Sequence, residues 1–155
     1  MCYHIYRHIK IFVLQGGIII MAQLNIEDLA NIFLSFESMT HKKLQKLCYY
    51  AQAWHLALLD KPLFNEKIEA WIHGPVIPDL YQKYKKYGYE SIKKQSINLK
   101  EIDKELYSFI KNIYDYYGEF DGDQLENITH QEDPWMETRF GLDSDERSHR
   151  EISKS

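Results

Sequence analysis

The apolar positions between Thr40 and Asp60 repeat every three or four residues. This spacing places one apolar stripe along one face of a helix of about five turns. Thr40 is suited to cap the first turn, and the Asp-Lys-Pro sequence at 60–62 ends the helix because proline cannot continue it. The stripe consists of Leu44, Leu47, Cys48, Ala51, Trp54, His55 and Leu58.

The period of the pattern changes to two after residue 67. Ile68, Ala70 and Ile72 alternate with Glu69, Trp71 and His73. This alternation predicts a short β-strand or hairpin arm near residues 68–72, which Gly74-Pro75 then ends. Pro78 is suited to open the next helix, and we expect that helix to run to Tyr87, before a glycine C-cap.

Four further segments have the apolar spacing and the capping residues of helices. They begin near Asn25, Leu99, Asp121 and Asp133. The mixed-charge, Ser-rich residues 143–155 are expected to be a frayed polar tail. The predicted fold is therefore mainly α: a single compact helical domain of about five to six helices over residues 21–142, with a short β-strand or hairpin arm.

Residues 1–20 differ from the rest of the chain. Two basic residues precede the apolar run 11–14, as in a signal peptide, but Gln15-Gly16-Gly17 interrupts the run and no small-residue cleavage site follows. The stretch is also too short for a membrane span of roughly 20 apolar residues. A purine-rich ribosome-binding site and its spacer would encode Gln-Gly-Gly followed by isoleucines. We hypothesise that translation starts at Met21 and that residues 1–20 are a non-native extension; a native peptide ending before Met21 in mass spectrometry would refute this.

The composition limits the classes of function. The chain has 155 residues, 45% of them apolar and 27% charged, which is typical of one globular domain. Its net charge is −4, and residues 21–155 carry 17 basic and 23 acidic side chains. This acidity argues against nucleic acid and favours a basic protein partner. The two cysteines, Cys2 and Cys48, give no disulfide framework, so we expect a cytoplasmic protein without a membrane segment.

No pattern of catalytic residues stands out in the sequence. It lacks a nucleophile motif, a phosphate-binding glycine loop, an HExxH motif and a paired-cysteine motif. Cys2, His4 and His8 are close in sequence, but no carboxylate or second ligand pair supports a metal site there. We therefore expect no enzyme activity, no cofactor and no metal, and a function in binding.

Two segments together resemble a known family. They are KLQKLCYYAQAWHLALLDKPLF and EAWIHGPVIPDLY, followed by a Tyr-Gly pair before a leucine-containing helix, Thr129-His130 and Pro134-Trp135. This combination, over about residues 25–140, is similar to the Panacea domain, the SocA-like antitoxin domain also found in prophage-associated proteins of the GepA type. The resemblance implies a small helical antitoxin of a toxin–antitoxin system, which binds and neutralises a cognate toxin from an adjacent gene. Some members of the family also deliver the toxin to a protease.

Polar and aromatic residues on the arm and near residue 130 are candidates for binding this partner. One face of the arm can reach the core while the other stays open. The segment 129–135 either closes a helix and plugs the core with its indole, or forms a groove with the arm. Exposed tyrosines serve as interface anchors because they are rigid and amphipathic. The candidate partner-binding residues are Trp71, His73, Tyr81, Tyr84, His130 and Trp135.

Lys83, Lys85 and Lys86, interleaved with tyrosines, leave a second function open. They form either a solvated helix face or a nucleic-acid contact. In the latter case the protein is a prophage-associated regulatory protein without a toxin partner. A strongly salt-dependent shift with DNA or RNA would favour the regulator, and a stable complex with the neighbouring gene product would favour the antitoxin.

Overall fold

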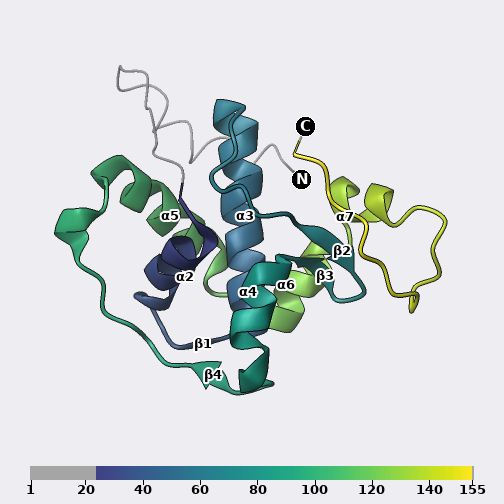
Figure 1. Cartoon of the computed structure of the whole chain (residues 1–155), viewed down its shortest axis with the longest axis horizontal. Coiled ribbons are helices and arrows are strands. Elements are labelled where there is room, and N and C mark those ends of the chain that lie inside the picture. Colours follow the sequence, from purple (N-terminus) through teal and green to yellow (C-terminus); the bar gives the residue numbers. More distant parts are fainter. Residues whose placement is uncertain (1–23, 155) are drawn as a thin grey trace.

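The computed structural model describes residues 24–154, which form a mainly α domain (Figure 1). Among these residues there are six α-helices: α2 (Ile26–Leu34), α3 (His41–Leu59), α4 (Pro78–Tyr84), α5 (Lys104–Tyr117), α6 (Gly122–Thr129) and α7 (Asp133–Thr138). Shorter elements are the 3-10 turns η1 (Lys85–Tyr87) and η2 (Leu99–Glu101) and the strands β1 (Met39–Thr40), β2 (Glu69–Trp71), β3 (Gly74–Val76) and β4 (Ser91–Ile92). The predicted fold class is confirmed. The expectation for residues 1–20 lies outside the described residues.

Helix α3 forms the centre of the domain, and it contacts α2, α4, α5, α6 and β3. Helices α2 and α5 lie on one side of α3, and the β2–β3 hairpin and α7 lie on the other (Figure 1). The Thr40 hydroxyl accepts a hydrogen bond from Lys43 N at 3.3 Å and caps the first turn. Asp60 ends the helix in the left-handed conformation, with φ of 52°. The predicted boundaries of this helix are confirmed.

The hydrophobic core fills the space between α3 and its neighbours. Completely buried side chains come from three helices: Leu44 and Leu47 from α3, Leu29 and Phe33 from α2, and Ile110 from α5. Burying one such side chain stabilises the folded state by about 1.5–3 kcal/mol relative to leaving it exposed. The core is therefore built from the apolar stripes that the spacing predicts.

The arm predicted from the alternating pattern is an antiparallel hairpin. Strand β2 pairs with β3 in the register Glu69↔Val76 and Trp71↔Gly74. The prediction that Gly74-Pro75 ends the extended segment is wrong, because Gly74 adopts a φ of +94° at the turn and the chain continues as β3. A second small sheet pairs β1 with β4. Its two-residue strands are too short to show an alternating pattern.

Two helix starts differ from the predicted ones. The segment predicted to be a helix from near Leu99 is divided into η2 and α5, because the Asp103 carboxylate accepts a hydrogen bond from Leu106 N at 2.9 Å and caps a new helix. The N-cap residue of α7 is Glu132, and Asp133 is already the first helical residue.

The C-terminal segment, which the sequence predicts to be frayed, lies against the hairpin. Ala70 N donates to Arg150 O at 2.9 Å, and Ile152 N donates to Ile68 O at 2.8 Å. Ile152 is only 5% exposed and belongs to the core. Two interactions hold this polar segment in place. Its backbone pairs with backbone groups at the edge of β2, and one apolar side chain anchors it in the core.

Candidate partner-binding site

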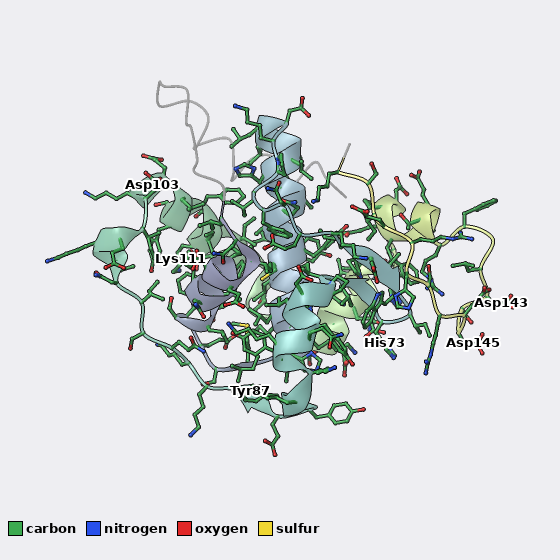
Figure 2. The ribbon with its side chains drawn as sticks, viewed as in Figure 1. His73, Tyr87, Asp103, Lys111, Asp143 and Asp145 are labelled. Atoms are coloured by element: carbon green, nitrogen blue, oxygen red, sulfur yellow. The ribbon has the colours of Figure 1, made fainter. Side chains whose placement is uncertain are left out.

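The hairpin, the α6–α7 junction and α4 together form a polar-aromatic surface, which we call the hairpin face. Five of the six predicted residues lie on it: Trp71, His73, Tyr81, His130 and Trp135. His73 is exposed at the hairpin turn (Figure 2), and the other four residues are half-buried. Residues from three separate parts of the sequence therefore form one surface.

Trp71 is held on the hairpin through both its side chain and its backbone. Its Nε1 donates to Glu69 Oε2 at 2.7 Å, and its carbonyl oxygen accepts from Trp135 Nε1 at 2.8 Å. Its ring meets the Tyr81 ring edge-on, with the centroids 4.9 Å apart. The Trp71 indole thus has a fixed orientation while part of it stays in contact with solvent.

Trp135 and His130 connect the hairpin to the helices. Their rings stack with the centroids 4.0 Å apart and 17° between the planes. Burial lowers the pKa of His130, and attraction to Glu126 opposes this only in part, so the imidazole is neutral near pH 7. The Trp135 indole packs against the core, as the first interpretation of this segment expects, and its N–H group also bonds to the hairpin backbone.

Glu126 on α6 is the charged group beneath the hairpin turn. One carboxylate oxygen lies 3.0 Å from His73 Nδ1, and the other forms an ion pair with Lys42. Lys42 also pairs with Asp123 at 2.6 Å. Burial alone would raise the pKa of Glu126, but the hydrogen bonds from Lys42 and His73 outweigh it and hold the pKa below its ordinary value. The ionised Glu126 therefore ties the hairpin turn to α3 and α6.

Lys46 on α3 is buried directly under the hairpin, with 1% of the residue exposed. Its Nζ donates to Pro75 O at 3.1 Å. Burial lowers the pKa of Lys46 to about 7, and attraction to Glu126 offsets only part of this effect. The hairpin thus rests on a group whose charge changes in the neutral pH range.

Glu69 has a similar role at the base of the hairpin. Its side chain is 4% exposed, forms an ion pair with Lys67 at 2.6 Å, and lies within hydrogen-bond distance of His149 Nδ1 at 2.9 Å. Burial alone would raise the pKa of Glu69, but hydrogen bonds from Lys67, Trp71 and His149 lower it to about 2. The charge of Glu69 therefore holds Trp71 and the C-terminal segment together.

Tyr84, the sixth predicted residue, does not lie on the hairpin face. It is 4% exposed and packs in the core cluster. Leu80 and Tyr84 are four positions apart and share the buried face of α4, whereas Tyr81 lies at the edge of that face. In this structure a partner cannot reach the Tyr84 side chain.

Several residues of the site carry no signal in the sequence. They are Lys42, Lys46, Glu69, Glu126 and His149. Charged residues are usually solvated, so their type alone does not mark them. Each acts through a partner distant in the sequence, such as His73 for Glu126 and Glu69 for His149.

Within residues 24–154, no group of His, Cys, Asp and Glu side chains converges in a way that could hold a metal ion. No helix in the same range is long and apolar enough to cross a membrane.

These features define a small, mainly α domain whose hairpin carries a rigid polar-aromatic face. The family model for the antitoxin SocA-like, Panacea domain matches residues 44–136, and the chain belongs to this family. The matched segment runs from α3 into α7 and contains all six predicted site residues. No curated protein and no solved structure matches the chain.

Proposed function

We propose that this protein is the antitoxin of a toxin–antitoxin system and that it neutralises a cognate toxin, encoded by an adjacent gene, by direct binding in the cytoplasm. Membership of the SocA-like antitoxin family supports the antitoxin role. The observation that carries the mode of action is the hairpin face, where aromatic side chains are fixed in position yet remain partly exposed.

Fixed aromatic side chains are well suited to protein binding. Trp and Tyr offer a large contact area, and little conformational entropy is lost on binding when their orientation is already set. Hydrogen bonds within the protein already occupy the N–H groups of Trp71 and Trp135. The exposed ring surface that is left is apolar, which favours contact with another protein. In this proposal the chain acts by covering the toxin and catalyses no reaction.

Growth measurements test the proposal. Each flanking open reading frame is expressed from an inducible promoter, alone and together with residues 21–155. We expect one product to arrest growth, this chain to relieve the arrest, and the two proteins to co-purify. Absence of arrest by either neighbour would refute the proposal.

Variants then test the hairpin face. His73→Ala should weaken binding and leave the fold intact, because 74% of the His73 side chain is exposed. Tyr116→Ala on α5, on the other side of α3, is the matched control and should leave binding unchanged. Circular dichroism of both variants separates loss of binding from loss of fold. If Trp71→Ala unfolds the domain, the role of that residue is structural.

A protease enters the proposal as a separate step. If the chain also delivers the toxin to a protease, the half-life of the toxin after protein synthesis is stopped should shorten when this chain is present. If binding alone neutralises the toxin, the half-life should stay the same or lengthen.

A second function, nucleic-acid binding by a prophage-associated regulatory protein, is favoured by one observation. Residues 83–100 contain six lysines and one acidic residue, Glu90. Tyr89, in the middle of this segment, is 101% exposed and available for base stacking. The acidic net charge of the chain argues against this function. A gel shift with DNA or RNA that weakens steeply with salt, together with no growth arrest by either neighbour, would favour nucleic-acid binding over the antitoxin function.

A further inference from the structure

Two large apolar side chains are exposed where α7 ends and the following loop begins. Phe140 is 85% exposed and Met136 is 49% exposed. We call residues 132–146 the α7 lobe; it lies at the edge of the molecule, beside the hairpin (Figure 1). A single exposed apolar side chain is common on protein surfaces. The surroundings of Phe140 distinguish this one.

Two arginines fix the backbone that presents Phe140. Arg139 is 5% exposed, and its guanidinium donates to the carbonyl oxygens of Ala70, Asp143 and Glu146 at 3.0, 3.1 and 2.7 Å. Arg150 Nη1 donates to Phe140 O at 2.9 Å. The loop is therefore anchored to β2 and to the C-terminal segment. An apolar ring on a fixed backbone can bind a partner with little loss of conformational entropy.

The exposed charges of the α7 lobe itself are acidic, and the exposed residues Arg147 and Arg150 follow the lobe in the sequence. Among residues 24–154, no ion pair neutralises the exposed carboxylates of the lobe, which are Asp133, Glu137, Asp143, Asp145 and Glu146. Asp143 and Asp145 lie at the outer edge of the molecule, away from the helices (Figure 2). Arg139, the basic residue of the lobe, is buried and bonded to carbonyl oxygens. The lobe thus combines exposed apolar side chains with five exposed carboxylates, and the exposed Arg150 is bonded to the backbone of Phe140.

We propose that the α7 lobe docks a basic surface of the toxin, with the Phe140 ring entering an apolar depression on that surface. The inference rests on the proposed function and adds the chemistry of the partner's surface. Charge complementarity favours a basic protein surface as the partner of the lobe, because the carboxylates would repel nucleic acid and anionic lipid. The hydrogen bonds from Arg139 to Ala70 and from Trp135 to Trp71 join the lobe to the hairpin face. One partner can therefore cover both.

The test uses the flanking gene product whose growth arrest this chain relieves, and it measures the dissociation constant of the complex. Phe140→Ser should weaken binding tenfold or more, as expected for an aromatic anchor. Tyr89→Ser is the matched control, because it removes another exposed aromatic ring at the lysine-rich end of the molecule. This control should change the dissociation constant less than about twofold.

A second pair of variants tests the charge. Neutralising the lobe with Glu137→Gln, Asp143→Asn and Asp145→Asn should weaken binding and make it less dependent on salt. The control neutralises three exposed acidic residues outside the lobe, with Glu90→Gln, Glu105→Gln and Glu119→Gln. It changes the net charge equally and should retain the salt dependence of the wild-type protein.

The outcomes separate the docking surface from the proposed function. If Phe140→Ser and the lobe triple variant bind like their controls, the inference is overturned and the antitoxin function stands. If Phe140→Ser instead dissociates a self-associated form of the free chain in gel filtration, the lobe contacts a second copy and the inference is also overturned. If the wild-type chain relieves no arrest, the proposed function fails, and the docking of a toxin fails with it.

Discussion

Replacing Lys46 by methionine should stabilise the protein, and the gain should shrink as the pH rises. The Lys46 side chain is buried between α3 and the hairpin, with Nζ bonded to Pro75 O at 3.1 Å. Burial lowers its pKa to about 7; Glu126 attracts the ammonium and Lys42 repels it. Methionine keeps a similar length and shape without the charge. The comparison therefore isolates the effect of a buried amine.

The pKa values give the sign and the size of the effect. The unfolded chain keeps the proton on Lys46 up to its ordinary pKa of 10.5, whereas the folded chain releases it near pH 7. Between these pH values the unfolded state binds more protons, so the free energy of unfolding rises with pH. The charged side chain destabilises the fold by about 5 kcal/mol below pH 7. This penalty should be about 2 kcal/mol smaller at pH 9 than at pH 7.

Urea unfolding of the wild-type protein and of Lys46→Met at pH 7, 8 and 9 measures this difference. Methionine cannot donate to Pro75 O, and the lost hydrogen bond should lower the stability of the variant by about 1 kcal/mol at every pH. The advantage of the variant should therefore be largest at pH 7 and decline steadily. Lys104→Met, at the exposed start of α5, is the control, and its unfolding free energy should stay parallel to that of the wild type.

Two results would refute this reasoning. One is a constant difference between Lys46→Met and the wild type from pH 7 to pH 9. The other is a variant that is less stable by about 3 kcal/mol or more at pH 7, which is the effect of leaving a buried charge without its partner. In that case Lys46 is a charged partner of Glu126, and the ion pair supports the hairpin.

Two further predictions concern buried groups near the hairpin face. Burial raises the pKa of Glu132 from 4.5 to about 7 against a hydrogen bond from Tyr50, so between pH 4.5 and pH 7 the unfolded state has released the proton that the folded state keeps, and this group lowers the stability of the wild type as the pH rises to 7. Glu132→Gln should remove this loss, and a difference in thermal midpoint between variant and wild type that stays constant from about pH 5 to pH 7 would contradict it. Gly74→Ala should destabilise by about 1–3 kcal/mol in urea, because φ is +94° and the new Cβ would lie 2.8 Å from Thr129 Oγ1. Gly141→Ala is the control, because Gly141 has a φ of +82° but open space around it. An equal loss of stability in both variants would mean that the contact with Thr129 contributes nothing to the effect at Gly74.

The helices could be predicted because their signals are local. The Asn25 side chain accepts a hydrogen bond from Asp28 N at 2.8 Å, so the cap and its donor are three residues apart. Asp121 and Gln124 form a reciprocal capping box over the same interval. Apolar spacing likewise reports which side of a helix is buried. Capping residues and apolar spacing can therefore both be read from the sequence without knowledge of the tertiary contacts.

The arrangement of the site could not be predicted in the same way. The sequence identifies Trp71 and Trp135 as candidates, but their hydrogen bond joins residues 64 positions apart. The C-terminal segment is polar on average, and the buried Ile152 side chain that anchors it does not change that average. Tyr81 and Tyr84 are indistinguishable by type, and only the packing of α4 decides which one is buried.

Different interactions stabilise the two sides of the domain, and this difference affects how substitutions on each side should change binding. The α2–α3–α5 side depends on apolar packing, which tolerates changes of shape when volume is conserved. The hairpin side depends on directed hydrogen bonds, to Trp71 O from Trp135, to Ala70 O from Arg139 and to Pro75 O from Lys46. Such bonds weaken steeply when their geometry changes. A substitution on the hairpin side should therefore displace the hairpin face before it unfolds the domain, so loss of binding with the helical fold retained is the expected signature of damage there.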